Sequence, residues 1–89
     1  MSKITEKINA GAKIIDVRSP DEYADGCYKG AVNIPVNILP NKTNSIGSKD
    51  TPIIVYCASG SRSAVAMSIL KAAGFKDVTN AGGLGDMPG

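Results

Sequence analysis

Residues 52–63 read Pro52-Ile53-Ile54-Val55-Tyr56-Cys57-Ala58-Ser59-Gly60-Ser61-Arg62-Ser63. The stretch contains four apolar residues in a row, at positions 53–56, and such a run without alternation predicts a strand that is covered on both faces. Residues 63–73 then place apolar side chains at helical spacing, and Gly74 follows as a natural end of a helix. We therefore expect a strand, a loop and a helix, with Cys57 at the carboxyl end of the strand.

Strands and helices also alternate in the rest of the chain. Ser19 is a natural N-cap, Pro20 suits the first helical position, and Glu22 completes a capping box. The short helix that begins there is expected to end before Gly26. The other expected elements are a helix at residues 3–10, a strand at 13–17, a turn and brief strand at 30–35, a helical turn at 37–39, a surface loop at 41–51, a strand at 77–80, and turns or a tail at 81–89. This order predicts an α/β domain with a mostly parallel sheet that is covered by helices.

The composition limits the chain to a few classes of protein. With 89 residues, the chain is long enough for one domain, residues 1–89, and too short for two. The net charge is +2 and the lysines are scattered along the sequence, so nothing indicates nucleic acid or a membrane as a partner. Neither a long apolar run nor a signal peptide is visible. We expect a cytoplasmic protein, with the periplasm as the alternative if a signal peptide has been removed, and we expect it to act as a monomer.

The chain contains no histidine and two cysteines, Cys27 and Cys57. The absence of histidine excludes Cys–His and Ser–His–Asp catalysis and any zinc site with histidine ligands. Two cysteines alone make a poor metal site, and in a small chain of intracellular type they are more often free than bridged. We therefore expect no metal and no cofactor.

Cys57 is the main candidate for a reactive group, because ligands bind beyond the carboxyl ends of the strands in parallel sheets. The four residues after it are small and can curl so that their backbone N–H groups point inward. These residues are Ala58, Ser59, Gly60 and Ser61. Inward amides at the start of a helix favour a thiolate and lower its pKa, and Arg62 adds a permanent positive charge. Such a thiolate can take the outer sulfur of thiosulfate or a similar donor, hold it as a persulfide, and pass it to cyanide or a thiol.

Three charged residues near the expected site each have two interpretations. Asp16 and Arg18 end the first strand, where one of them either lines the site or braces the loop through Arg62. The alternative is a structural hydrogen bond or ion pair, and we favour this alternative for Asp16. Glu22 is first a capping residue, and a role in holding Arg62 is the less favoured interpretation.

Two further features lie outside the loop. Cys27 is either a resolving thiol that pairs with the oxidised Cys57 or a partly exposed cysteine in a turn, and pairing would need Cα atoms within about 7 Å. Gly82 and Gly83 are expected to form a tight turn near the loop rather than a phosphate-binding cradle.

Several motifs, in this order and with this spacing, make the sequence resemble the rhodanese-like family, and within it the small single-domain thiosulfate sulfurtransferases of the phage-shock-protein E type. The motifs that carry the resemblance are Ile14-Ile15-Asp16-Val17-Arg18-Ser19-Pro20-Asp21-Glu22-Tyr23, Gly30-Ala31-Val32-Asn33-Ile34-Pro35, Val55-Tyr56-Cys57-Ala58-Ser59-Gly60-Ser61-Arg62-Ser63, Gly74-Phe75-Lys76-Asp77-Val78 and Asn80-Ala81-Gly82-Gly83-Leu84. Together they span nearly the whole chain. The chain departs from many family members at Cys27, where they have histidine, and at Asp86-Met87, where they have tryptophan.

The resemblance implies a central, five-stranded parallel sheet with helices on both faces. It also implies thiosulfate:cyanide sulfurtransferase activity in which Cys57 carries the sulfur as a persulfide and no other cofactor takes part. In the family, a six-residue loop such as 57–62 goes with sulfur transfer, whereas related phosphatases and arsenate reductases use a loop that is one residue longer. A phosphatase or arsenate reductase, and a binding module without catalysis, are the alternatives that remain.

Overall fold

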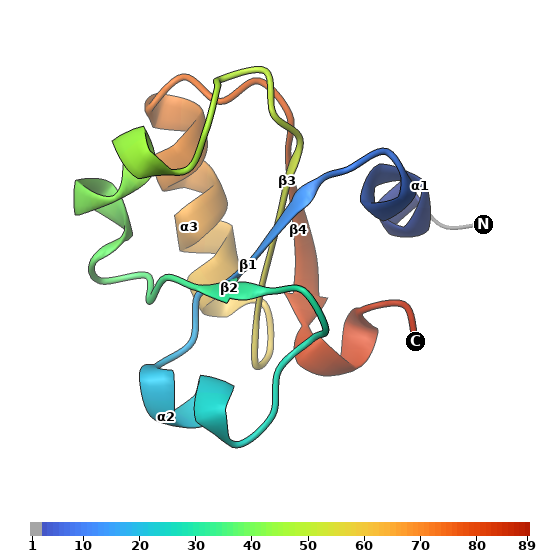
Figure 1. The fold of residues 1–89 in the computed structure, drawn as a ribbon. Coiled ribbons are helices and arrows are strands. Elements are labelled where there is room, and N and C mark those ends of the chain that lie inside the picture. The colour runs from blue at the N-terminus through green and yellow to red at the C-terminus, as the bar shows by residue number, and fades with distance from the viewer. Residues whose placement is uncertain (1–2) are drawn as a thin grey trace.

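The computed structural model describes residues 3–89, which form a parallel sheet between two layers of helices (Figure 1). The strand order is β2-β1-β3-β4, and each neighbouring pair is parallel. The strands are β1 at Lys13–Asp16, β2 at Val32–Asn33, β3 at Ile53–Cys57 and β4 at Val78–Gly83. The α-helices are α1 at Lys3–Asn9, α2 at Pro20–Ala24 and α3 at Ser61–Ala72, and three short 3₁₀ helices are η1 at Leu39–Asn41, η2 at Thr43–Ser45 and η3 at Leu84–Asp86.

Strand β3 is the centre of the core, and every one of its five residues is buried. Alternate side chains of a strand point to opposite faces of the sheet. Val55 and Cys57 accordingly pack into one hydrophobic cluster, whereas Ile54 and Tyr56 pack into another. The expectation of a strand covered on both faces is thus confirmed.

Helices cover both faces of the sheet, as expected. On one face lies α3, which packs Ala66 and Leu70 against the sheet together with Leu39 of η1. On the other face lie α1, through Ile4 and Ile8, and the C-terminal segment with η3. Helix α2 sits below the sheet in Figure 1, at the carboxyl ends of the strands, where the chain leaves β1.

The sheet has four strands, so the five-stranded sheet implied by the family resemblance is wrong in number. The four strands lie where the residue pattern predicted them, and residues 3–89 contain no fifth one. Outside the strands and α-helices, residues 3–89 form turns, bends, irregular segments and 3₁₀ helices. No helix within residues 3–89 is long and apolar enough to cross a membrane.

Three segments are more ordered than the sequence predicted. The expected turn at 37–39 is a 3₁₀ helix two residues later, after the amides of Ile38 and Leu39 bond to the Pro35 carbonyl at 3.0 and 3.1 Å. The expected loop at 41–51 contains η2 and buries Ile46. The expected turns or tail at 81–89 instead continue β4 to residue 83, form η3, and bury Met87. Each of the three segments contains a buried apolar residue: Leu39, Ile46 or Met87.

Candidate active site

Cys57 is the last residue of β3, and the loop after it leads directly into α3. Its side chain has no exposed surface, whereas Ala58, Ser59 and Ser61 above it are exposed. The amide of Gly60 donates a hydrogen bond to the Cys57 sulfur at 2.9 Å. Gly60 is the N-cap of α3 and has a φ of +104°, a left-handed conformation that glycine adopts without strain. One of the amides predicted to surround the sulfur, that of Gly60, therefore contacts it.

Opposing effects set the pKa of the Cys57 thiol. Burial raises the pKa, because a buried thiolate loses its hydration. Hydrogen bonds from the Ser63 side chain and from the amides of Ser63, Gly60 and Ser59 lower it. The net result is a pKa of about 7, below the ordinary value of a thiol. The site thus lowers the pKa of the thiol without any histidine.

Strand β4 lies against the loop so closely that only glycine fits. The register between β3 and β4 shifts at Val55/Tyr56, and Gly82 has a φ of +93° there. A Cβ at Gly83 would overlap the carbonyl oxygen of Ala58, and a Cβ at Gly60 would lie 3.3 Å from the Gly82 Cα. Gly82 and Gly83 are thus near the loop, as predicted, but they belong to a strand with a bulge instead of a tight turn.

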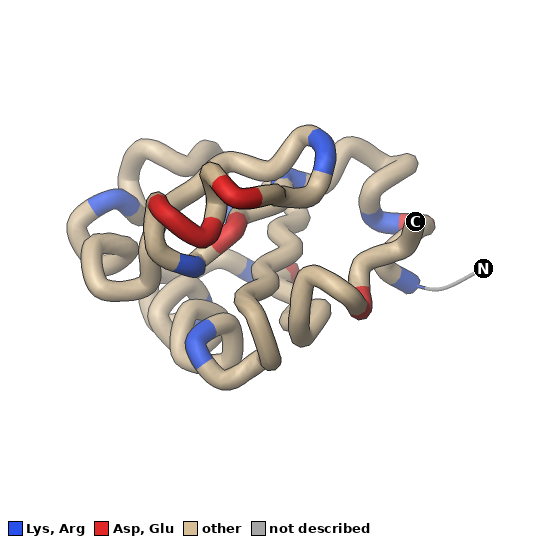
Figure 2. The backbone as a smooth tube through the Cα atoms, turned by 90° about the horizontal axis from the view of Figure 1, so that it is seen from below, with Lys and Arg blue, Asp and Glu red and all other residues tan. Residues whose placement is uncertain are grey.

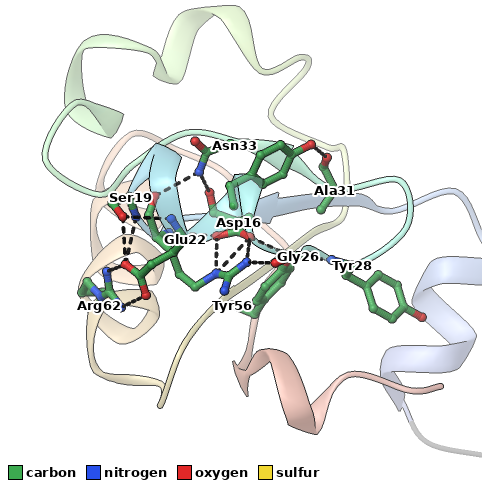
Figure 3. Close-up of polar contacts among 11 residues, drawn as sticks. Asp16, Ser19, Glu22, Gly26, Tyr28, Ala31, Asn33, Tyr56 and Arg62 are labelled. Atoms are coloured by element: carbon green, nitrogen blue, oxygen red, sulfur yellow. Dashed lines mark hydrogen bonds and ion pairs between the residues drawn. The ribbon is translucent and has the colours of Figure 1, made fainter.

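Arg62 forms a two-pronged ion pair with Glu22 of α2 (Figure 3). The nitrogen–oxygen distances are 2.6 and 3.0 Å, and both side chains are about a third exposed. Glu22 also accepts from the backbone amide of Ser19, whose hydroxyl in turn accepts from the Glu22 amide, so the predicted capping box is present. The hydrogen bond from Arg62, followed by that from Ser19, lowers the pKa of Glu22 to about 2. Glu22 therefore performs both of its suggested roles at once.

Asp16 and Arg18 form a buried ion pair at the end of β1. The Arg18 guanidinium reaches Asp16 at 2.7 Å, and the Arg18 amide donates to the same carboxylate at 2.9 Å. Tyr56 donates its hydroxyl proton to Asp16 at 2.8 Å and accepts from the Tyr28 amide, while Arg18 also donates to the Gly26 carbonyl at 2.6 Å. These bonds tie β1 and β3 to residues 26–28. Asp16 and Arg18 thus form a structural ion pair, which is the interpretation favoured for Asp16. The carboxylate that contacts Arg62 is that of Glu22 instead.

The two cysteines differ in environment. Cys27 is exposed and Cys57 is buried, and both thiols are free. Residues 3–89 contain no group of three or more His, Cys, Asp and Glu side chains that could hold a metal ion. Lysine and arginine positions are dispersed over the backbone of these residues rather than gathered into a stripe (Figure 2).

Sequence reasoning missed two residues of the site, Ser63 and Asn80. The Ser63 hydroxyl lies 3.5 Å from the Cys57 sulfur and donates to the Asn80 side-chain oxygen at 2.6 Å. Ser63 carried a signal, because it lies three and seven residues before Ala66 and Leu70 and so shares the buried face of α3. Asn80 carried none, because a polar residue in a short strand is equally well placed at a surface.

A depression of about 400 Å³ lies beside the loop and includes Arg62 in its lining. Its walls are the start of α2, Val17 and residues 35–38, and they are mostly apolar. A second depression of about 380 Å³ runs along β1 and β2 and includes no residue of 57–62. Of these two depressions, the first alone has a residue of the loop, Arg62, in its lining.

The sequence and the fold both match known proteins. Residues 1–84 match the model of the rhodanese-like domain. The chain is 38% identical over 74 residues to the thiosulfate sulfurtransferase PspE of Escherichia coli K12, which covers 82% of this chain and 71% of PspE. It is 34% identical over 67 residues to a sulfurtransferase of Allochromatium vinosum, which covers 75% of this chain and 62% of that protein. The chain thus spans less than two thirds of the second relative.

Among solved structures, a rhodanese with anions from E. coli superposes with a TM-score of 0.81 at 37% identity, covering 88% of this chain and 95% of that one. A human single-domain sulfurtransferase, TSTD1, gives the same TM-score at 24% identity, which shows a shared fold. The match of the family model extends over both the sheet and the cysteine loop. The chain belongs to the rhodanese-like domain family.

Proposed function

We propose that this protein is a sulfurtransferase that moves sulfane sulfur from thiosulfate, or a similar donor, to cyanide or a thiol through a persulfide on Cys57. The observation that carries the proposal is the contact between the Gly60 amide and the Cys57 sulfur, at the carboxyl end of the central strand. The names of the relatives, among them a thiosulfate sulfurtransferase, point to the same chemistry. Apart from the donor, the acceptor and the sulfur that Cys57 carries, the proposed mechanism uses no cofactor.

The first step forms a sulfur–sulfur bond. The Cys57 thiolate attacks the outer sulfur of thiosulfate, the sulfur–sulfur bond of thiosulfate breaks, and sulfite leaves with the bonding electron pair. The negative charge of the thiolate passes to the outer sulfur of the new persulfide. Amides of the curled loop, of which Gly60 already contacts the sulfur, favour such an anion.

The second step regenerates the thiolate. Cyanide attacks the outer sulfur, the persulfide bond breaks, and Cys57 leaves as a thiolate while thiocyanate departs. No net oxidation or reduction of the enzyme occurs over the two steps. Because the enzyme alternates between two forms, we expect ping-pong kinetics.

The burial of Cys57 adds a requirement. In this conformation the sulfur has no exposed surface, so it cannot react with a dissolved molecule. The covering residues of the loop are themselves exposed and small, so their displacement exposes little apolar surface. We propose that the exposed residues Ala58 and Ser59 move aside when a donor enters from the depression beside Arg62, while the Gly60 amide keeps its contact with the sulfur.

Intact-mass measurement tests the proposed function directly. Incubation with thiosulfate should add the mass of one sulfur atom to the protein and release one equivalent of sulfite. Cys57→Ser should abolish both, whereas the matched variant Cys27→Ser should keep both. A folded wild-type chain that gains no sulfur from thiosulfate or from any other sulfane donor contradicts the proposal, and turnover of an aryl phosphate would favour the phosphatase alternative.

The pH dependence of the first step provides a second test. With a pKa of about 7 for Cys57, the thiolate fraction rises steeply between pH 6 and pH 8 and then levels off. The single-turnover rate of sulfur uptake should follow this curve. Arg62→Ala should move the curve to higher pH and weaken the binding of thiosulfate, because the cation near the thiolate is lost. A rate that keeps rising to pH 9 in the wild type would exclude an activated thiolate.

A further inference from the structure

The hydroxyl of Ser63 has one proton and four candidate acceptors around it. It lies 2.6 Å from the side-chain oxygen of Asn80, 3.1 Å from the Gly60 carbonyl, 3.4 Å from the Gly82 carbonyl and 3.5 Å from the Cys57 sulfur. The Ser63 side chain is completely buried, so bulk water does not reach the hydroxyl. The direction of a single O–H bond therefore decides whether the sulfur receives a hydrogen bond from Ser63.

The orientation of the Asn80 amide settles where that proton lies at rest. The Gly82 backbone N–H, which can only donate, bonds to the Asn80 side chain at 2.9 Å, so the atom that it meets is the amide oxygen. The Asn80 nitrogen faces the Gly60 carbonyl at 3.3 Å. Because the Asn80 oxygen has no proton to give, the 2.6 Å contact requires Ser63 to donate. The resting hydroxyl thus points away from Cys57.

The resting arrangement suits a thiol and not a thiolate. With its proton on Asn80, Ser63 turns oxygen lone pairs toward the sulfur, and a thiol can donate to them. A thiolate has no proton to donate, so it gains a hydrogen bond only if the Ser63 O–H turns from Asn80 to the sulfur. The Asn80 oxygen keeps its bond from Gly82 after that turn and is not left unpaired.

We propose that Ser63 is a movable hydrogen-bond donor for the Cys57 sulfur and that Asn80 is a positioning residue that holds this donor away from the uncharged sulfur. The proposal rests on the proposed function for its place in the reaction. Cys57 is anionic as the attacking group of the first step and as the leaving group of the second, and Ser63 then donates to it. In the persulfide the charge lies on the outer sulfur, and the Ser63 proton returns to Asn80.

The charged groups around the loop stay unchanged in the variants that test this proposal. They are Arg62 on α3, Glu22 on α2, Arg18 after β1, and Asp86 on η3, which accepts from the Gly83 amide at 2.8 Å. Truncation of Ser63 also leaves few groups unpaired. The Asn80 oxygen retains the Gly82 amide, and the Gly60 carbonyl retains the Ala64 amide at 3.0 Å. Ser63→Ala should therefore fold.

The test is the pKa of Cys57, measured in a Cys27→Ser background by ultraviolet absorbance of the thiolate and by the rate of iodoacetamide alkylation as a function of pH. Ser63→Ala should raise the pKa by about one unit, because the thiolate loses a hydrogen bond. Asn80→Ala should lower it by a smaller amount, at most about half a unit, because the Ser63 proton loses its nearest acceptor and keeps only the more distant Gly60 and Gly82 carbonyls as competitors of the sulfur. The two neighbouring substitutions thus have opposite signs.

The double variant Ser63→Ala/Asn80→Ala separates this mechanism from a general loosening of the loop. If Asn80 acts through Ser63, the shift caused by Asn80→Ala should vanish in the Ser63→Ala background. An unchanged pKa in Ser63→Ala, or an Asn80→Ala shift that persists in the double variant, overturns the proposal. If Asn80→Ala does not fold, Ser63→Ala decides alone, and a Cys57 pKa that does not rise in that variant overturns the proposal.

This measurement needs no sulfur donor. Opposite shifts in the two single variants, together with a double variant whose pKa equals that of Ser63→Ala, support the proton switch even in a protein that takes up no sulfur. The intact-mass experiment alone decides the proposed function. Where both succeed, Ser63→Ala should slow the release of sulfur from the persulfide to cyanide, because Cys57 then leaves as a less stabilised thiolate.

Discussion

Two carboxylate–arginine pairs, whose carboxylates at Asp16 and Glu22 lie close together in the sequence, have opposite characters in this fold. Asp16 and Arg18 lie within a buried network in which their side chains are 0% and 9% exposed. Glu22 pairs with Arg62 across 40 residues, and those side chains are 36% and 37% exposed. Each pair has nitrogen–oxygen distances of 2.6–3.1 Å, so geometry alone does not distinguish them.

The difference lies in what else each pair contacts. The buried pair receives a hydroxyl from Tyr56 and donates to the Gly26 carbonyl, so it joins two strands to a loop. The half-exposed pair joins α2 to the first turn of α3, beside the loop that holds the cysteine. A buried pair must stay intact because neither charge can be hydrated in its place. An exposed pair can exchange its partner for water or for an anion, and this freedom suits a position next to a reaction site.

Asp16→Ala should have the largest effect and tests the buried half of this comparison. Removal of the carboxylate leaves the Arg18 charge and the Tyr56 hydroxyl buried without their acceptor. We expect a loss of about 3–5 kcal/mol in the free energy of unfolding, measured by urea titration. Such a loss is a large part of the stability of a small domain, which is roughly 5–15 kcal/mol in total.

Asp21→Ala is the matched control, because Asp21 is an exposed aspartate in the neighbouring helix. Its substitution should change the free energy of unfolding by less than about 1 kcal/mol. Equal losses of unfolding free energy in the two variants would show that the buried network contributes no more to stability than an exposed aspartate does.

Tyr56→Phe should have an intermediate effect on the same network. The substitution keeps the ring in the core but removes a donor to Asp16 and the acceptor of the Tyr28 amide at 2.9 Å. We expect a loss of about 1–3 kcal/mol, because the buried Asp16 carboxylate loses a donor and the partly buried Tyr28 amide loses its acceptor. Burial raises the pKa of Tyr56 to about 12, so the tyrosine is a neutral donor throughout the accessible pH range.

Tyr28→Phe provides the comparison for that variant. It removes a hydroxyl that donates to the Pro88 carbonyl at 2.6 Å, near the end of the chain. The loss should be smaller than that of Tyr56→Phe, because the site is only partly buried and water can replace the bond. A larger loss for Tyr28→Phe would show that the bond from Tyr28 to the C-terminal segment stabilises the domain more than the bonds of Tyr56 in the β1 network do.

The comparison also shows which contacts the sequence could reveal. The apolar run at 53–56 and the small residues after Cys57 predicted the central strand and its loop, because both depend on neighbours in the sequence. The burial of Ile46 and Met87 was not predicted. Each is a single apolar residue in a polar or glycine-rich segment, and only contact with the folded core buries it.

Pairings between distant residues account for most of what was missed in the site. The favoured interpretation of Glu22 was a helix cap, which local spacing identifies, whereas its bond to Arg62 depends on how α2 packs beside α3. Ser63 and Asn80 meet because β4 runs beside β3, and sequence spacing does not encode that meeting. Local patterns thus predicted the reactive sulfur, and tertiary packing determines the groups that tune it.

Glu22→Gln should have the smallest effect on stability and tests the exposed half of the comparison. Glutamine keeps the side-chain oxygen that caps α2 but removes the charge that neutralises Arg62. The free energy of unfolding should change by less than about 1 kcal/mol at pH 7, because exposed ion pairs contribute little. The pKa of Glu22, about 2, means that the wild-type pair persists down to pH 4 and is lost only as the pH falls toward 2. The freed guanidinium should instead bind an anionic donor, so the KM for thiosulfate should fall several-fold and depend more steeply on salt.

Asp21→Asn removes the same charge one residue earlier on the same helix, and its carboxylate is not the one paired with Arg62. If the whole field of α2 acts on the donor, the two variants should lower KM equally. If the ion pair acts through Arg62, only Glu22→Gln should do so, and the effect should disappear when Arg62→Ala is added. Opening an ion pair that is about a third exposed costs little free energy. A substitution in this pair can therefore change donor binding while it barely changes the free energy of unfolding. A substitution in the buried Asp16 pair would destabilise the domain.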